Sequence, residues 1–288
     1  MTVTHNLPRG AALMVLSGLL FAGMGLGVKL AAQTLPNAAV VFFRSAISLV
    51  LMLPWVWARG TSLRTRRLPE HLARGLAGLG SMYCFFYALG HLPLADAVLL
   101  NYSLPLFMPF VESVWLGEPF PPRLWGAIGL GFAGIVLILK PGLGLFQPAA
   151  VVGLAAALFA AVAQVGVRGL TRTEPVTRII FYFSVISTAV SAVPVSVAWR
   201  TPPPPAWAAL AATGILATAA QFSLTSAYSH APASRVGPFI YSSVVFAAAL
   251  DWLFFGRLPD PLSVAGTVLV VAAGALTLRM TAAQPAPA

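Results

Sequence analysis

The chain contains 288 residues, of which 59% are hydrophobic and 8% are charged, and its mean hydropathy is +0.87. Because soluble domains carry roughly 25% charged residues, this composition excludes an ordinary water-soluble domain. The net charge of +10 would suit nucleic acid only if Lys and Arg clustered on one surface. Here they separate apolar runs, so the expected partner is the lipid bilayer and not nucleic acid.

Ten apolar runs of membrane-spanning length follow one another along the chain. A helix needs about 20 apolar residues to cross a hydrocarbon core that is about 30 Å thick. The runs are continuously apolar and do not alternate, which favours helices over the strands of a membrane barrel. The predicted spans cover residues 10–32, 37–57, 71–91, 94–116, 123–140, 150–170, 176–198, 206–229, 236–255 and 261–279. The sequence therefore predicts an all-α integral membrane protein.

The segment before the first span, MTVTHNLPRG, is short and polar, and the run after it is long enough to span, so no cleavable signal is expected. If the N-terminus faces the cytoplasm, twelve Lys and Arg residues flank the spans on the cytoplasmic side and four on the opposite side. This bias follows the positive-inside rule. We therefore predict a multi-pass protein of the cell inner (plasma) membrane with both termini in the cytoplasm.

The second predicted span contains a charged residue, Arg44, which lies roughly 10 Å from the outer end of the helix at 1.5 Å per residue. A central arginine costs about 2.5–3.5 kcal/mol on insertion scales, so it should face protein and find a partner. Depth along the membrane suggests Asp251 or Asp96 as that partner and argues against Glu112. A structural ion pair is one interpretation, and an outer gate or a site for a substrate carboxylate is the other.

Along the fourth span, Asn101, Pro105, Met108 and Glu112 share one helical face. Pro105 and Pro109 each remove a backbone donor and should bend or loosen the helix. A bent helix with an amide at mid-depth and a carboxylate below it is typical of a cavity wall. A kink needed only for packing, with Glu112 bonded to a neighbouring hydroxyl, is the alternative.

Other polar residues gather near the middle of several predicted spans. Phenol, amide and hydroxyl groups suit a small ligand with both polar and apolar parts, although any one of them can serve an interhelical hydrogen bond instead. The candidate substrate-binding residues are Tyr83, Tyr87, Asn101, Tyr102, Gln164, Gln221, Thr225, Tyr228, Tyr241 and Ser242.

The fifth and tenth spans carry almost no polar groups and are rich in small residues, such as Ala127, Gly131 and Gly134. Small residues at these spacings allow close contact between helices. We expect them to pack within the bundle, and a homodimer through one of these spans is the alternative.

Two halves of the chain repeat each other at an offset of 139 residues. YALGHLPLADAVLLNYS at 87–103 corresponds to SAYSHAPASRVGPFIYS at 226–242, so that His91, Pro93 and Tyr102 match His230, Pro232 and Tyr241. Each half holds five predicted spans, and an odd number inverts the second copy relative to the first. The sequence therefore predicts ten transmembrane helices as two inverted five-helix repeats, over 10–140 and 150–279.

The order and spacing of HLPLADAVLLNYSLPLF, VWLGEPF and GAIGLGFAGIVLILKPG, together with FFRSAIS at the start of the second span, resemble the EamA family of the drug/metabolite transporter superfamily. The resemblance covers nearly the whole chain as two copies. It implies ten helices, cytoplasmic termini and movement of small metabolites, often outward. In the second copy Gly256-Arg257 stands where the first has Gly117-Glu118, and Phe183 stands where the first has Arg44. The roles of Glu118 and Arg44 are therefore expected once per molecule.

These features predict a secondary transporter of a small polar or zwitterionic metabolite, such as an amino acid, an amino-acid derivative or an opine-type metallophore. No Walker motif, catalytic cluster or metal-ligand spacing occurs, so we expect no enzyme activity, no cofactor and no metal. A multidrug carrier or a carrier of lipid-linked metabolites is the alternative, ahead of a membrane-embedded enzyme or a channel.

Gating or proton coupling is expected at Arg44, Glu112 and Asp251, because Glu112 and Asp251 occupy equivalent positions of the repeats. A carboxylate acts in proton coupling when burial moves its pKa toward the working pH. Asp251 is expected to be neutralised by Arg44. Glu112, for which the sequence suggests no partner at its depth, is the expected proton site.

Overall fold

The computed structural model describes residues 6–58, 60–116, 124–139, 147–170, 173–197, 199–230 and 237–282, except for the side chains of residues 116, 138, 139, 168, 225, 228, 229, 237, 238, 277, 278, 281 and 282. Every regular element in these ranges is a helix. The helices are α1 (Leu7–Ala31), α2 (Asn37–Ala58), α3 (Leu68–His91), α4 (Leu94–Asn101), α5 (Leu104–Leu116), α6 (Leu124–Leu139), α7 (Pro148–Leu170), α8 (Val176–Val197), α9 (Pro204–His230), the 3-10 helix η1 (Gly237–Tyr241), α11 (Ser242–Phe255) and α12 (Pro261–Ala282).

Six of the described helices are long and apolar enough to cross a membrane: α1, α2, the α4–α5 pair, α7, α8 and α9. Three further apolar helices of the described ranges, within α6, η1–α11 and α12, are shorter. α3 belongs to neither group, and it carries Glu70 and Arg74 in its first two turns. The all-helical membrane fold is thus confirmed, and six of the ten predicted spans meet the criteria of length and composition.

The fourth predicted span is broken in two. α4 ends at Asn101 and α5 begins at Leu104, and the intervening turn is held by the Ser103 hydroxyl, which donates to the Leu100 carbonyl at 2.6 Å. Pro105 has no N–H to donate to the carbonyl one turn back, so a continuous helix would lack a hydrogen bond here. The proline-induced loosening predicted from the sequence therefore takes the form of an interruption. η1 and α11 form a second composite span, which changes from 3-10 to α geometry at Tyr241–Ser242.

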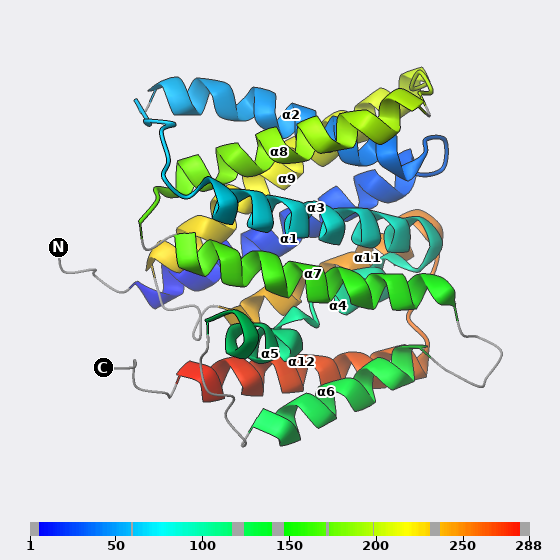
Figure 1. The fold of residues 1–288 in the computed structure, drawn as a ribbon. Coiled ribbons are helices and arrows are strands. Elements are labelled where there is room, and N and C mark those ends of the chain that lie inside the picture. Colours follow the sequence, from blue (N-terminus) through cyan, green and yellow to red (C-terminus); the bar gives the residue numbers. More distant parts are fainter. Residues whose placement is uncertain are drawn as a thin grey trace.

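The helices pack mainly as long pairs: α1 along α9, α3 along α7, α2 along α8 and α6 along α12 (Figure 1). Gly134 makes the α6–α12 contact possible, because a Cβ at this position would lie 2.7 Å from the Gly266 carbonyl oxygen. The small residues of these two helices thus serve packing inside the bundle, as expected from the sequence.

The first turn of α1 and the last turn of α12 lie at the same end of the bundle, where α2 also connects to α3 (Figure 1). The end of α7 and the start of α8 lie there too (Figure 1). We refer to this end as the α2–α3 end.

Candidate functional site

A narrow cleft with a polar lining lies between α2, α3, α8 and α9. We call it the arginine cleft. Its lining residues are Arg44, Ser48, Met52, Arg74, Ile180, Phe183, Ser184, Thr218 and Gln221. The free volume within it is about 10 Å³, which is roughly the room that one water molecule needs. In this conformation the helices therefore close around the polar groups.

Arg44 is held in the cleft by the geometry of α2. Arg44, Ser48 and Met52 follow one another at intervals of four residues, which places them on one helical face, and all three are buried. Only 6% of Arg44 is exposed. Its guanidinium carbon lies 5.8 Å from the centre of the Phe183 ring, and its Nε has no hydrogen-bond partner among the described residues.

Arg74 approaches the same aromatic ring from α3. Its guanidinium carbon lies 3.9 Å from the centre of the Phe183 ring, within the range of a cation–π contact. The ring fits there because residue 78 is a glycine, whose Cβ would lie 2.8 Å from the Phe183 ring. The Nε and Nη1 atoms of Arg74 are buried and lack a hydrogen-bond partner among the described residues.

The two guanidinium groups line the same small cleft. Arg44 is the charged neighbour of Arg74, and no carboxylate of the described residues acts on either group. Nor does either arginine form a salt bridge within the described part of the chain. Two like charges thus share a poorly hydrated space, an arrangement that is costly for the empty protein and favourable for an anion.

The rest of the lining supplies neutral polar groups and apolar walls. The hydroxyls of Ser48 and Thr218 share a hydrogen bond of 3.0 Å across α2 and α9. Gln221 lies one turn beyond Thr218 on α9 and is half-buried. Met52 and Ile180 complete the apolar part. The cleft therefore combines cationic, neutral polar and apolar surfaces.

The predicted pairing of Arg44 with Asp251 is wrong. One oxygen of Asp251 accepts a hydrogen bond of 3.2 Å from the Ala95 N–H at the start of α4, and its charge acts on Lys29. The charge of Asp96, the other predicted partner, acts on Lys29 as well. Depth in the membrane gives the height of a side chain but not its direction, and α11 packs on α1 and α4 instead of α2.

Lys29 itself lies at the end of α1, where 8% of it is exposed. Its ammonium group donates to the carbonyl of Leu92 and, at 3.4 Å, to that of Leu89 at the end of α3. A cation at a helix C-terminus and a carboxylate at a helix N-terminus both interact favourably with the backbone dipoles. The Lys29 cluster, made up of Lys29, Asp251 and these helix ends, therefore stabilises the turn between α3 and α4.

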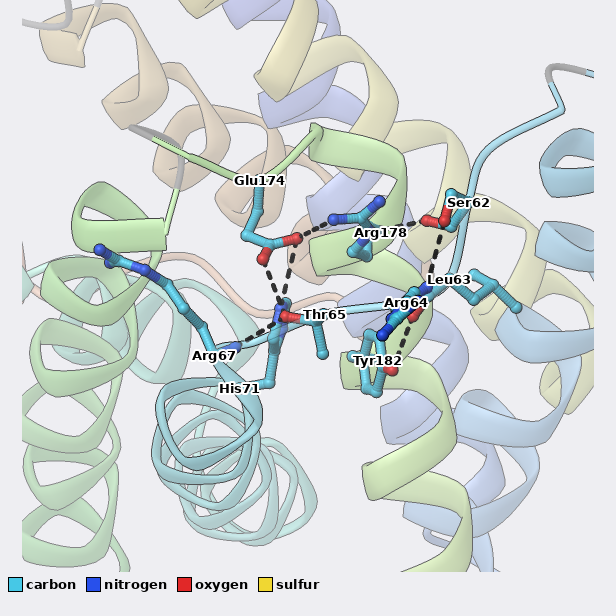
Figure 2. A network of polar contacts seen from close by, with 9 residues as sticks. All are labelled: Ser62, Leu63, Arg64, Thr65, Arg67, His71, Glu174, Arg178 and Tyr182. Carbon is cyan, nitrogen blue, oxygen red and sulfur yellow. Dashed lines mark hydrogen bonds and ion pairs between the residues drawn. The ribbon is translucent and has the colours of Figure 1, made fainter.

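A second polar feature, which we call the loop network, joins the α2–α3 connection to α8 (Figure 2). Glu174 is its centre: it accepts hydrogen bonds from Thr65 Oγ1 at 2.8 Å and from Arg178 Nη1 at 2.5 Å. Arg178 Nε donates to the Ser62 carbonyl at 2.7 Å, and the Tyr182 hydroxyl donates to the Leu63 carbonyl at 2.8 Å. These bonds tie three separate segments together at the α2–α3 end.

His71 completes the loop network from the first turn of α3. Its ring stacks on that of Tyr182 with centres 4.6 Å apart, and its Nε2 lies 4.0 Å from a Glu174 oxygen (Figure 2). Burial would raise the pKa of Glu174, but the hydrogen bonds from Arg178 and Thr65 and the charges of Arg178 and His71 hold that pKa below its ordinary value of 4.5. Glu174 is therefore a carboxylate at neutral pH.

A profile of the EamA-like transporter family matches residues 8–140 and, a second time, residues 147–279. The chain belongs to the EamA-like transporter family. It is a transporter rather than an enzyme, and a multi-pass protein of the inner membrane.

The EamA-like chain is similar to three kinds of bacterial transporter. It is 38% identical over 276 residues to the pseudopaline exporter CntI of Pseudomonas aeruginosa, covering 94% of this chain and 96% of the exporter. It is 27% identical to a riboflavin transporter of Vibrio cholerae, covering 94% and 93% of the two chains. It is 28% identical to an S-adenosylmethionine uptake transporter of Rickettsia felis, covering 81% and 80%. These relatives establish a metabolite transporter of the drug/metabolite transporter type.

A solved crystal structure has the same fold as this EamA-like chain. The two superpose with a TM-score of 0.66 and share 23% identity, over 96% of this chain and 99% of the other. At this identity the likeness extends to the fold alone.

The structure separates the sequence-predicted site residues of this EamA-like transporter into several groups. Arg44 and Gln221 meet in the arginine cleft. Asn101 and Tyr102 lie at the break between α4 and α5, and Tyr241 and Ser242 at the junction of η1 with α11.

The remaining predicted residues lie on single helices. Tyr83 on α3 packs against the hydrophobic core with its hydroxyl buried, whereas 39% of Tyr87 is exposed and its ring stacks on His91. Gln164 is half-buried on α7, and Glu112 is buried on α5. Thr225 and Tyr228 belong to α9, and their side chains lie outside the described residues.

Of the nine lining residues of the arginine cleft, the sequence prediction includes only Arg44 and Gln221, and the two most informative omissions are Arg74 and Phe183. Arg74 was counted among the charges that flank the spans, although it falls within the predicted third span at 71–91. Phe183 was noted only as the residue that replaces Arg44 in the second copy. The signal in the sequence is the offset of 139 residues between Arg44 and Phe183: because α2 packs along α8, the Arg44 guanidinium carbon lies 5.8 Å from the centre of the Phe183 ring.

Proposed function

We propose that this chain is a secondary transporter that exports a small polar or zwitterionic metabolite across the inner membrane. The substrate would be an amino acid or an amino-acid derivative, with opine-type metallophores as the leading class. The observation that carries the proposal is the 38% identity to a pseudopaline exporter over nearly the whole of both chains. The mixed lining of the arginine cleft supports a ligand with charged, neutral polar and apolar parts.

We further propose that the two halves form inverted repeats that move by alternating access. Two observations support this architecture. The family profile matches the chain twice, over stretches that agree with the predicted repeats. The helix pairing is also unchanged when the halves are exchanged: α1–α9 becomes α7–α3, while α2–α8 and α6–α12 map onto themselves.

In this proposal the loop network is the gate at the α2–α3 end. It joins segments of the first half, at Ser62 to His71, to Glu174, Arg178 and Tyr182 of the second half. The charge bias of the connections assigns this end, with both termini, to the cytoplasm. In a background with Cys84 replaced, a single cysteine at Thr65 or Thr173 should react with an impermeant reagent only from the cytoplasm, and one at Pro203 only from outside. External labelling at Thr65 would overturn this orientation.

Coupling to protons is proposed at Glu112, which is 5% exposed in α5 within the broken span. A buried carboxylate that changes its protonation state during the cycle would link export to the proton gradient. Glu112→Gln should abolish transport driven by a pH gradient and preserve exchange between equal pools in proteoliposomes. If the wild-type protein does not respond to a pH gradient, and Glu112→Gln transports equally well, the protein is a facilitator.

The function is tested by comparing metabolites inside cells and in the medium for a deletion strain, the same strain complemented, and wild type. Export predicts that one amino-acid derivative accumulates inside the deletion strain and disappears from its medium. Riboflavin and S-adenosylmethionine should keep their wild-type distribution. Unchanged profiles across metal-limited and metal-replete growth would contradict the proposal, and a change confined to flavins would replace its substrate class.

A further inference from the structure

The arginine cleft has a feature that an ordinary polar cavity does not need, namely two guanidinium groups at one aromatic ring. We propose that Arg44 and Arg74 together bind carboxylate groups of the transported molecule, so that the transporter selects metabolites with more carboxylates than amines. This inference rests on the proposed transport function and specifies the substrate class of the same site.

First, Arg44 and Arg74 carry positive charges that no carboxylate of the described residues neutralises. Arg44 is 6% exposed, and buried nitrogen atoms of both arginines lack hydrogen-bond partners within the described residues. Burying an unpaired cation costs several kcal/mol, and a second cation nearby adds to that cost. The charges are not needed for the fold in the way that Lys29 and Arg178 are, because those two donate to carbonyls or a carboxylate. A bound anion would offset the cost.

The second step is the shape of the pair. Guanidinium groups are planar forks that match carboxylates with two parallel hydrogen bonds. Here both forks lie at the Phe183 ring, at 3.9 and 5.8 Å from its centre. The two arginines line the same space, and the ring offers a flat apolar surface beside it. A flat carboxylate on an organic skeleton fits this surface better than a tetrahedral, fully hydrated phosphate ion.

The third step is the rest of the lining. Ser48, Ser184, Thr218 and Gln221 offer hydroxyl and amide groups, and the described residues of the lining include no Asp or Glu. An ammonium group of the substrate would therefore meet neutral acceptors, whereas its carboxylates would meet two full positive charges. The balance favours a molecule with a net negative charge, such as an imino acid that carries two carboxylates on one amine.

Access to the site passes the loop network. His71 precedes Arg74 by one turn of α3, and Tyr182 directly precedes Phe183 on α8. Separation of α3 from α8 at the network would therefore widen the cleft at the arginines. The gate and the proposed carboxylate site are mechanically linked through these two helices.

The test uses the full chain, purified in detergent, and a matched series of probes. N-(1-carboxyethyl)-L-alanine carries two carboxylates on one secondary amine, and its monoamide and diamide keep the size while removing one or both charges. Calorimetric titration should show that wild type binds the dicarboxylate about tenfold or more tightly than the monoamide, and the diamide hardly at all. Inorganic phosphate and sulfate are run beside the series.

Substitutions distinguish the effect of the planar guanidinium geometry from the effect of the positive charge. Arg74→Gln and Arg44→Gln should each lower affinity for the dicarboxylate by about tenfold or more, and Arg74→Lys should recover only part of it. Thr218→Val should change affinity less than either. Arg66→Gln, an exposed arginine of the α2–α3 connection, should bind like wild type. If Arg44→Gln does not fold, Arg74→Gln and Arg74→Lys carry the test.

Three results would overturn the carboxylate site. They are equal affinity of wild type for the dicarboxylate and the diamide, unchanged affinity in Arg74→Gln, and tighter binding of phosphate than of the dicarboxylate. These outcomes leave the proposed function intact if the deletion strain still retains an amino-acid derivative. If the protein binds the dicarboxylate selectively but the deletion strain has unchanged metabolite profiles, the proposed export function is contradicted and the carboxylate site is supported.

Discussion

The arginine cleft and the loop network share helices α3 and α8 and use arginine in opposite ways. In the loop network, Arg178 on α8 donates to Glu174 and to the Ser62 carbonyl. In the cleft, Arg74 on α3 and Arg44 on α2 both lie near one aromatic ring, with buried nitrogens that have no partner in the described part of the chain. An arginine that is bonded to a carboxylate at a connection holds segments of the chain together. Two buried arginines without a carboxylate partner in the described part of the chain are instead suited to binding an anionic ligand.

The Lys29 cluster belongs with the loop network in this contrast. Lys29 is as deeply buried as Arg44, with 8% of it exposed, yet its ammonium group donates to two carbonyls at the end of α3. Burial alone therefore does not distinguish a structural charge from a binding charge. The availability of partners within the protein does.

The largest expected effect separates stability from activity in the cleft. Arg74→Gln should lower export by about 100-fold, because removing one partner of a desolvated charge interaction costs 2–5 kcal/mol in binding. In the absence of substrate the same variant should unfold at the same temperature as wild type or higher, since it relieves an unpaired buried charge. Export is measured in complemented deletion cells, and unfolding by thermal denaturation of the purified protein. A large loss of thermal stability would place Arg74 among the structural charges.

The opposite pattern is expected in the Lys29 cluster. Asp251→Asn should destabilise the protein by roughly 3 kcal/mol and reduce its folded yield, because it removes the stronger of the two carboxylate charges that act on the buried Lys29. The protein that does fold should bind the dicarboxylate probe with wild-type affinity. Lower affinity at unchanged yield would instead assign Asp251 to the binding site.

A smaller loss of stability is expected from the loop network. Glu174→Gln should cost about 1.5–3 kcal/mol, the usual range for hydrogen bonds to a charged group. It should also increase labelling from the α2–α3 end of a cysteine placed at Ser184 in the cleft, since the gate opens more often. Thr65→Val, which removes one of the hydrogen bonds to Glu174, is the milder control. Equal labelling in all three proteins would show that the network is not a gate.

The smallest expected effect is a change with pH in the stability that Glu174 contributes. The pKa of Glu174 in the folded protein lies below its ordinary value of 4.5, so its stabilising effect is complete above pH 4.5 and is lost as the pH falls through the lowered pKa. The difference in unfolding temperature between wild type and Glu174→Gln should therefore shrink below pH 4.5. A difference that is constant between pH 7 and pH 3.5 would show that the carboxylate charge is not what the network uses.

The sequence predicted where the helices lie along the chain better than which helices are neighbours. Apolar run length located the helices, and Pro105 located a distortion that the structure shows as a break after Asn101. The same reasoning predicted that Arg44 faces protein, and it is buried. It failed for the Arg44–Asp251 pair, because hydropathy and depth carry no information about which helices are adjacent.

The residues of the arginine cleft can be identified only when it is known which helices pack against each other. α2 packs on α8 and α3 lies beside both, which brings Arg44, Arg74 and Phe183 together from three distant stretches of chain. Arg74 was taken for a flanking charge because it lies near the end of an apolar run, where arginines normally reach the membrane surface. For Glu112 the structure records a contact within the protein, so the expectation that it lacks a partner does not hold, and its proposed coupling role rests on burial alone.

Counterflow in proteoliposomes tests the central claim most directly. Vesicles that contain the full chain are loaded with unlabelled N-(1-carboxyethyl)-L-alanine, and uptake of the labelled dicarboxylate and of its labelled monoamide is measured separately. The account predicts that wild type takes up the dicarboxylate about tenfold or more faster than the monoamide, and that Arg74→Gln takes up the two at similar rates. Equal uptake of both probes by wild type, or the same preference in wild type and Arg74→Gln, would contradict it.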